Sequence, residues 1–162
     1  MSNLPQGATS ITLEFAREYL RADVEDASDE QMQTFIDNAL SVCEGFCNRR
    51  FYATQAEVNA ARQAAIDAYP ALKEEREAAL ADVEDCDLRN FIVDSYIPQF
   101  AALNAQAVGM VINGNIMAAW LTMLGHGWAN REEDVVASTN VNTLPTGAKR
   151  ILQPYLWIGD LG

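Results

Sequence analysis

The chain is poor in positive charge, and this shortage excludes a class of function. Its 162 residues contain 11 lysines and arginines against 23 aspartates and glutamates, which gives a formal net charge of −12. Proteins that bind nucleic acid tightly need clustered basic side chains to displace the counterions of the phosphates. We therefore do not expect this protein to bind DNA or RNA tightly.

The acidic excess is uneven along the chain. Residues 1–94 contain 19 of the acidic and eight of the basic side chains, so the C-terminal part is nearly neutral. We expect one face of the molecule to be strongly negative.

Cysteine and histidine are scarce, which argues against disulfides and metal centres. The three cysteines, Cys43, Cys47 and Cys86, are an odd number in a chain long enough to fold without disulfides, so free thiols in a reducing cytoplasm are expected. Cys43 and Cys47 are spaced to share a helix face, but a structural zinc site needs four ligands, and the single histidine, His126, is far away in sequence. Buried thiols are the better interpretation, and no metal or cofactor is expected.

No charged residue occurs between Ser95 and Asn130, a stretch long enough to raise the question of a membrane span. Asparagines, Gln106 and Pro98 interrupt it, and each would be costly in hydrocarbon. Residues 1–9 also show no basic stretch followed by an apolar run, so no signal peptide is expected. A helix buried by protein, with no membrane contact, is the preferred interpretation.

Motifs of catalysis are missing as well. There is no nucleophile elbow and no glycine-rich phosphate loop for His126 to serve, so a helix-end or packing role is favoured for this residue. The adjacent acidic residues 132–134 do not converge on one substrate, and the acidic residues 23–30 lack the spacing of a calcium loop. We expect a protein that is not an enzyme, with a solvated acidic loop.

Capping patterns and apolar spacing predict a mainly α protein. Thr12 precedes a short helix over 13–20, and the capping box Ser28–Gln31 opens a second helix whose apolar stripe extends to Cys47 and about Arg50. A second box, Thr54–Glu57, opens an alanine-rich helix that Pro70 is expected to break or kink.

The remaining elements are predicted from breakers and caps. Residues 71–83 are expected to form a helix that projects into solvent. Asp87 is expected to cap a further helix, with a joint at Pro98. Residues 105–124 are expected to form a long buried helix that ends at Gly125. Residues 135–137 form a short extended segment, and a last helix or arm begins at Pro145 and ends at Pro154. The expected fold is a small helical bundle.

Two C-terminal segments are unusual in combination. Residues 125–132 read GHGWANRE, and residues 144–155 read LPTGAKRILQPY. Their order resembles the end of the head–tail connector proteins (adaptor or head completion proteins) of long-tailed bacteriophages. Gly127 is inserted relative to that pattern, Ala129 replaces an aromatic residue, and Leu156 stands where arginine is common.

The resemblance covers residues 11–51 and 106–158. The N-terminal part matches only in the order of a short helix, an acidic loop and a helix that ends in CNRRF. The middle of the chain has no counterpart that we can name. The sequence therefore predicts one connector domain over 1–162, with a helical insertion at about 53–105.

The resemblance implies a structural protein of the virion neck that is assembled in the host cytoplasm. In that family a ring, commonly of twelve subunits, docks beneath the portal protein and presents a platform to the next neck or tail protein. An acidic channel would let DNA pass without specific binding. Two alternatives stay open: a tail completion or stopper protein, and a small acidic regulator that binds a host protein.

Six residues are candidates for subunit interfaces. Large aromatic rings near a chain end often anchor interfaces, although packing within the subunit is an equal alternative for them. The basic side chains would pair with carboxylates of a neighbour, or else act only as solubilising surface charges. The candidates are Trp128, Arg131, Lys149, Arg150, Tyr155 and Trp157.

Overall fold

The structure is a computed structural model that describes residues 9–131 and 144–159. It is mainly helical, so the predicted fold class is confirmed. The chain divides into two compact units: the first combines Met1–Cys47 with Ile112–Leu156, and the second combines Asn48–Val111 with Trp157–Gly162. The predicted extended segment at 135–137 lies outside the described residues.

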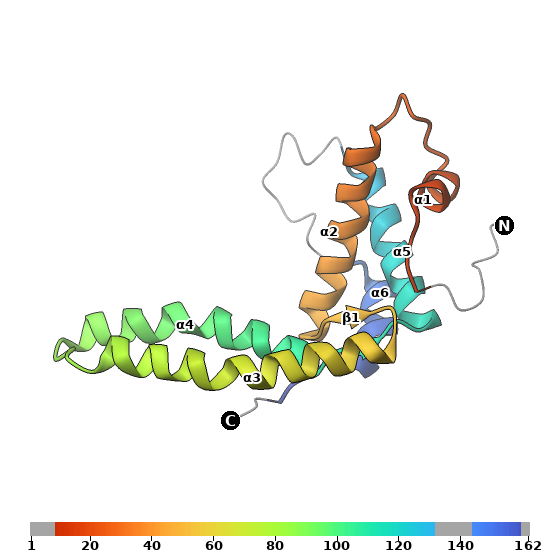
Figure 1. Cartoon of the computed structure of the whole chain (residues 1–162). Coiled ribbons are helices and arrows are strands. Elements are labelled where there is room, and N and C mark those ends of the chain that lie inside the picture. The colour runs from red at the N-terminus through yellow and green to blue at the C-terminus, as the bar shows by residue number, and fades with distance from the viewer. Residues whose placement is uncertain (1–8, 132–143, 160–162) are drawn as a thin grey trace. The chain divides into compact units, whose positions relative to one another are not determined.

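The first unit is a small bundle built around one buried helix. Its helices are α1 (Leu13–Leu20), α2 (Asp29–Cys47), α5 (Gly114–Ala129) and α6 (Thr146–Leu152), followed by the 3-10 turn η2 (Gln153–Tyr155). Helix α5 packs against both α2 and α6, while α1 packs against α2 (Figure 1). Nine of the 16 residues of α5 are buried, which explains why it carries no charged side chain.

The first two helices begin where the sequence predicts. The Thr12 hydroxyl accepts a hydrogen bond from the Phe15 amide, and the Ser28 and Gln31 side chains each accept one from the other's amide. The stripe along α2 is buried as predicted, and its buried apolar members are Met32, Ile36, Ala39, Cys43 and Cys47.

Helix α2 is shorter than predicted. It ends at Cys47 and does not extend to Arg50, because Asn48 takes a left-handed φ of 52° that ends the helical path.

The long helix predicted over 105–124 is also wrong. Helix α4 ends at Ala107, strand β2 (Met110–Val111) follows, and α5 begins only at Gly114. The break arises at Asn113, whose side-chain oxygen accepts hydrogen bonds from the amides of Asn115 (3.0 Å) and Ile116 (3.1 Å) and so caps a new helix. Gly125 does not end α5, which continues to Ala129.

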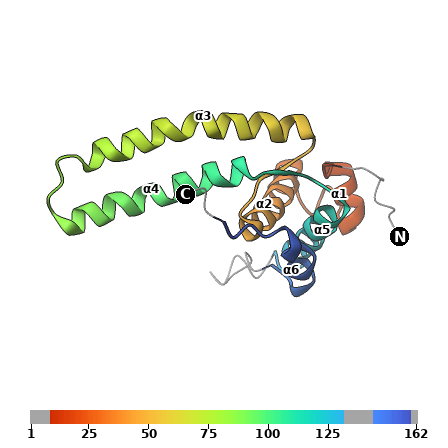
Figure 2. The same cartoon turned by 90° about the horizontal axis from the view of Figure 1, so that it is seen from below.

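The second unit is an antiparallel helical hairpin with a short bridge at its base. Helices α3 (Gln55–Leu80) and α4 (Cys86–Ala107) lie side by side in both views (Figures 1 and 2). Strand β1 (Phe51–Tyr52) pairs in parallel with β2, with Phe51 opposite Met110. Gly109 allows this close approach, because a Cβ there would lie 2.5 Å from the Tyr52 ring.

Both prolines of the hairpin lie inside helices. Pro70 neither breaks nor separates α3, so residues 71–80 belong to the helix that starts at Gln55, and Pro98 is likewise internal to α4. Contacts across the hairpin explain this tolerance: the rings of Tyr69 and Phe100 meet edge to face at 5.4 Å, beside Pro70 and Pro98 in sequence. Packing outweighs the one backbone hydrogen bond that each proline removes.

The cap of α4 is Asp85 and not the predicted Asp87. The Asp85 carboxylate accepts a hydrogen bond of 2.8 Å from the Leu88 amide. Within residues 9–131 and 144–159, no helix has the length and apolar character needed to cross a bilayer.

Candidate protein–protein interface

Trp128 and Arg131 form one pair at the end of α5. The Trp128 side chain is 8% exposed, and its ring meets Phe35 of α2 edge to face at 5.5 Å. The Arg131 guanidinium lies over the Trp128 ring, 4.1 Å from its centre. Most of the Trp128 ring is thus buried against Phe35 and Arg131. A partner that approached this end of α5 would contact Arg131 before Trp128.

Lys149 and Arg150 are held outward by the packing of α6. Ala148 and Leu152, on the inner side of this short helix, are fully buried, while both basic side chains are exposed. Both lie in the last turn, where positive charge is favourable to the helix dipole. Neither forms an ion pair with another described residue, so both charges are accessible to a partner.

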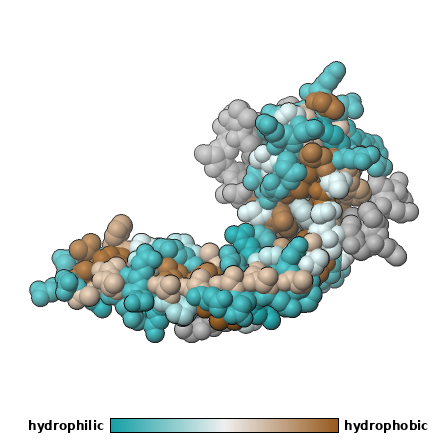
Figure 3. All heavy atoms as spheres, viewed as in Figure 1, coloured by the Kyte–Doolittle hydropathy of each residue, from teal (hydrophilic) through white to brown (hydrophobic). Residues whose placement is uncertain are grey.

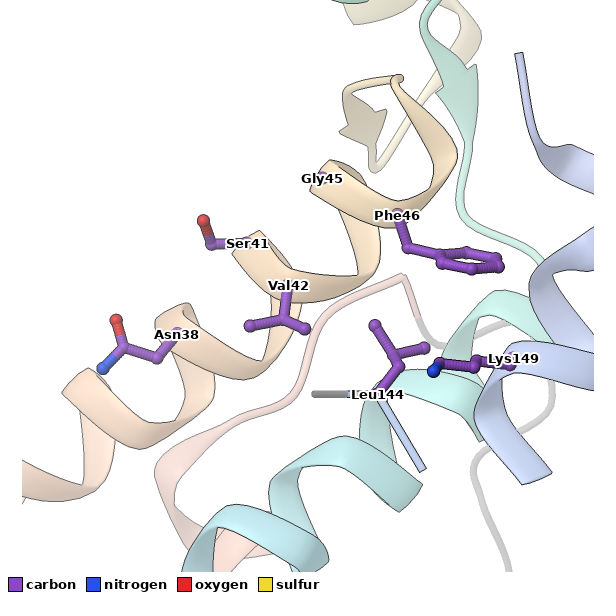
Figure 4. Close-up of a pocket in the computed structure, with 7 residues that line it drawn as sticks. All are labelled: Asn38, Ser41, Val42, Gly45, Phe46, Leu144 and Lys149. Carbon is purple, nitrogen blue, oxygen red and sulfur yellow. The ribbon is translucent and has the colours of Figure 1, made fainter. Parts of the chain in front are cut away.

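A groove of about 600 Å³ runs between α2 and the start of α6 (Figure 4). In this view Val42 and Phe46 project from α2 on one side, with Leu144 and Lys149 on the other. Asn38, Ser41 and Gly45 complete the lining. The groove thus combines an apolar floor with one basic side chain at its edge.

Tyr155, at the end of η2, contacts the start of α5. Its hydroxyl accepts hydrogen bonds from the side-chain amides of Asn113 (3.3 Å) and Asn115 (3.0 Å), at the start of α5. The Pro154–Tyr155 turn, which is part of η2, places the hydroxyl there. This predicted interface residue therefore has a definite contact inside the unit.

Trp157 belongs to the second unit. The Arg49 guanidinium lies 5.3 Å from the centre of its ring, and its carbonyl accepts a hydrogen bond of 3.1 Å from the Asn48 side chain. Its indole nitrogen is buried without a hydrogen-bond partner among the described residues. The ring is half-buried, so one part of it stays open to solvent.

Few contacts join the five predicted residues of the first unit. Among the described residues, ring contacts and hydrogen bonds connect only Arg131 with Trp128, and of the six candidates only Lys149 lines the groove. The sequence analysis did not predict this groove. Asn38, Ser41 and Val42 carry no distinctive signal, because polar and small residues on the outer side of a helix are ordinary.

The cysteines of α2 are buried thiols, as predicted. Cys43 and Cys47 are fully buried, and burial raises the pKa of Cys43 to about 12, with the neighbouring Cys47 and Glu44 adding to the effect. The Cys47 sulfur lies 4.0 Å from the Leu152 carbonyl oxygen. A thiol held protonated in this way is a poor nucleophile at neutral pH.

The acidic loop between α1 and α2 is organised by Arg17. Its guanidinium donates to the carbonyls of Asp23 and Ala27 and forms an ion pair of 2.7 Å with Asp29. The remaining carboxylates of the loop are exposed. In the described part of the chain no three potential ligands come close enough to hold a metal ion.

His126 lies in the last turn of α5. The Asn130 side-chain amide lies 3.2 Å from its ring nitrogen Nδ1 and donates to its carbonyl oxygen at 2.8 Å. These contacts agree with the helix-end role, one of the two roles favoured from the sequence.

Comparison with known proteins found no matching family model, no similar curated protein and no similar solved structure. The resemblance to phage connectors therefore stays a prediction from the residues.

Proposed function

We propose that this chain is a non-enzymatic subunit of the neck of a long-tailed bacteriophage. It forms a ring beneath the portal, completes the head and joins it to the next neck or tail protein. This role requires no cofactor, and DNA passes through the ring without specific binding.

One observation carries the proposal: the parts of the chain that resemble connectors fold together. The resembling spans, 11–51 and 106–158, nearly coincide with the two segments of the first unit, while the unmatched middle forms the hairpin of the second. Residues of both C-terminal motifs contribute to this unit, through Trp128 on α5 and through Leu144 and Leu152 around α6. A coincidental likeness would have no reason to respect the boundaries of a folded unit.

The negative charge of the first unit supports a role as the wall of a channel through which DNA passes. The exposed carboxylates of the α1–α2 loop form a negative surface, and the phosphates of a duplex are repelled by such a surface. A channel wall of this kind would let the genome slide without being held.

The basic side chains of α6 support docking onto a larger partner. In a chain of net charge −12, the exposed Lys149 lines a groove with an apolar floor, and the exposed Arg150 follows it on α6. An apolar contact ringed by charges is the usual anatomy of a protein interface. We assign this surface to the portal side of the ring.

Co-sedimentation with the purified portal protein of the same phage tests the proposal. We expect the chain to sediment with the portal as a ring-shaped complex in a fixed ratio of subunits. A tail completion or stopper protein would bind only after the connector is in place, and a host-directed regulator would ignore the portal. Absence of binding to the portal at micromolar concentrations would refute the connector assignment.

A further inference from the structure

A hollow of about 470 Å³, the Arg76 hollow, lies between the two helices of the hairpin. Its lining includes Tyr69 and Arg76 of α3 with Ile97, Phe100 and Asn104 of α4. Figure 3 shows apolar residues along the hairpin, between hydrophilic ones. A hollow of this volume, with apolar and polar walls, has the dimensions of a small-molecule site.

Arg76 has a donor that nothing in the described part of the chain satisfies. Its Nε is buried without a hydrogen-bond partner there, and its guanidinium lies over the Phe100 ring, 5.1 Å from the ring centre. Neither of the ion pairs found among the described residues includes Arg76. Because a buried donor without an acceptor costs free energy, an acceptor bound in the hollow would offset that cost.

The sequence explains why Arg76 has no carboxylate beside it. Residues three and four positions away on a helix are surface neighbours, and for Arg76 these are Leu72, Lys73, Ala79 and Leu80. Across the hairpin, residues 95–107 of α4 carry no charged side chain. Burial does not account for this absence, because Ile97 within that stretch is 58% exposed. The two helices thus leave the guanidinium to a ligand.

The charges around the hollow favour a ligand with one negative charge. The guanidinium offers a planar pair of N–H groups that matches a carboxylate. Lys73, which also lines the hollow, is already paired with Glu77 at 3.8 Å and adds little. Glu74 and Glu75 precede Arg76 directly, so a dianion such as a phosphate monoester would meet more repulsion than a monoanion.

The remaining walls of the hollow favour an apolar body on the ligand. The rings of Tyr69 and Phe100 meet edge to face at 5.4 Å, and Ile97 adds a branched aliphatic side chain. Flat or branched apolar groups pack well against such surfaces. The hollow therefore combines one cation with an apolar wall.

We propose that the Arg76 hollow binds a monocarboxylate with an apolar body, with the carboxylate on Arg76 and the body beside Ile97 and the two rings. A free small molecule and the C-terminal residue of another polypeptide can both present these groups. The inference goes beyond the neck function and does not depend on it.

Titration of the isotope-labelled chain with benzoate, followed by amide chemical shifts, tests the proposal. Benzamide is the matched probe, because it keeps the ring and lacks the charge. We expect benzoate to bind at about 1 mM, an ordinary value for a ligand of so few atoms, and to shift amides of α3 and α4 around the hollow. Benzamide should bind about tenfold more weakly, because it cannot form the charged pair with Arg76.

Arg76→Met should weaken benzoate binding about tenfold and leave benzamide binding unchanged, because methionine keeps an unbranched stem against Phe100 without the charge. Arg89→Met is the matched control, since Arg89 is exposed on α4 and does not line the hollow. Ile97→Asp is a second variant at a position that is more than half exposed. Its carboxylate should also weaken benzoate binding, by repulsion and by pairing with Arg76. All three variants are expected to keep the helical circular-dichroism signal of the parent.

Three results would overturn the proposal: no shift at about 20 mM benzoate, equal binding of benzoate and benzamide, or equal losses in Arg76→Met and Arg89→Met. A further probe, N-acetylglycylphenylalanine, distinguishes the two sources of the carboxylate. Binding tighter than that of benzoate assigns the site to a chain end, and equal or weaker binding assigns it to a free small molecule. Loss of portal binding would refute the proposed function and leave this site standing.

Discussion

Single side chains in the first unit show how burial decides chemistry. Cys43 and Cys47 share a helix face, and from spacing alone they resemble half of a metal site. Both are buried instead, and burial raises the pKa of Cys43 to about 12, so this thiol is a weak nucleophile at neutral pH. Cys86, on the hairpin, is exposed.

Thiol labelling should separate the three cysteines. With Ellman's reagent at pH 8, we expect one thiol per chain, Cys86, to react at once and the two thiols of α2 to react only after unfolding. Cys86→Ser should abolish the fast reaction. Rapid reaction of two or more thiols in the native protein would show that the core of α2 is open.

The raised pKa of Cys43 also predicts a loss of stability at high pH. In the unfolded chain this thiol ionises near its ordinary pKa of 9.0, whereas in the folded protein it stays protonated up to about pH 12. Between these values the unfolded state binds fewer protons, so the free energy of unfolding falls by up to about 1.4 kcal/mol per pH unit. Urea titrations of the parent and of Cys43→Ala at pH 8 and pH 10.5 measure it, and the variant should lose less stability across this range.

Trp120 is a second residue whose role is structural. Its buried indole nitrogen donates a hydrogen bond of 2.9 Å to the Ile36 carbonyl, which connects α5 with α2. Trp120→Phe should lower the free energy of unfolding by about 2 kcal/mol or more, through the lost bond and the space left behind. Trp157→Phe is a matched control, because the Trp157 nitrogen has no partner among the described residues. Equal losses for the two variants in urea titrations would contradict this role.

At the scale of elements, caps were better predictors than breakers. The capping boxes at Ser28 and Thr54 fix the starts of α2 and α3, because each is satisfied by neighbours in sequence. The breaks predicted at Pro70 and Pro98 were wrong, because whether a proline ends a helix depends on residues that pack beside it and are distant in sequence. The paired short strands β1 and β2 could not be foreseen, because residues 51 and 110 are distant in sequence.

Pro70→Ala tests the tolerance of α3. Alanine restores the amide that can donate to the Ile66 carbonyl, and it has the higher helix propensity. We expect the hairpin to gain about 1–3 kcal/mol, seen as a higher midpoint of thermal unfolding at 222 nm. A lower midpoint would mean that the proline ring itself contributes packing in the hollow that it lines with Ile66 and Leu103.

At the scale of the whole molecule, charge is separated along the fold. Carboxylates crowd the α1–α2 loop and the tip of the hairpin, while α6 presents adjacent basic residues. In the proposed ring this separation would repeat from copy to copy, so that one zone would repel DNA and another would attract an acidic partner. The proposed portal contact depends on the second zone.

The double variant Lys149→Glu/Arg150→Glu should reduce portal binding at least tenfold. Both side chains are exposed without ion pairs among the described residues, so the subunit should remain folded, apart from a loss of about 1 kcal/mol at the end of α6. Binding to immobilised portal measures the effect. The charge-preserving variant Lys149→Arg/Arg150→Lys should bind as the parent does. Unchanged affinity of the reversed variant would remove α6 from the interface.

The sequence by itself determined the helical class, the starts of α1, α2 and α3 and the buried stripe of α2, because these depend on neighbours within one or two turns. It also determined that two motifs with a connector-like order occur in the C-terminal third. Only the tertiary structure decided that Pro70 and Pro98 stay inside their helices, that the chain turns between Ala107 and Gly114, and that the middle forms a helical hairpin. Those outcomes depend on contacts between residues far apart in the chain, which local pattern does not encode.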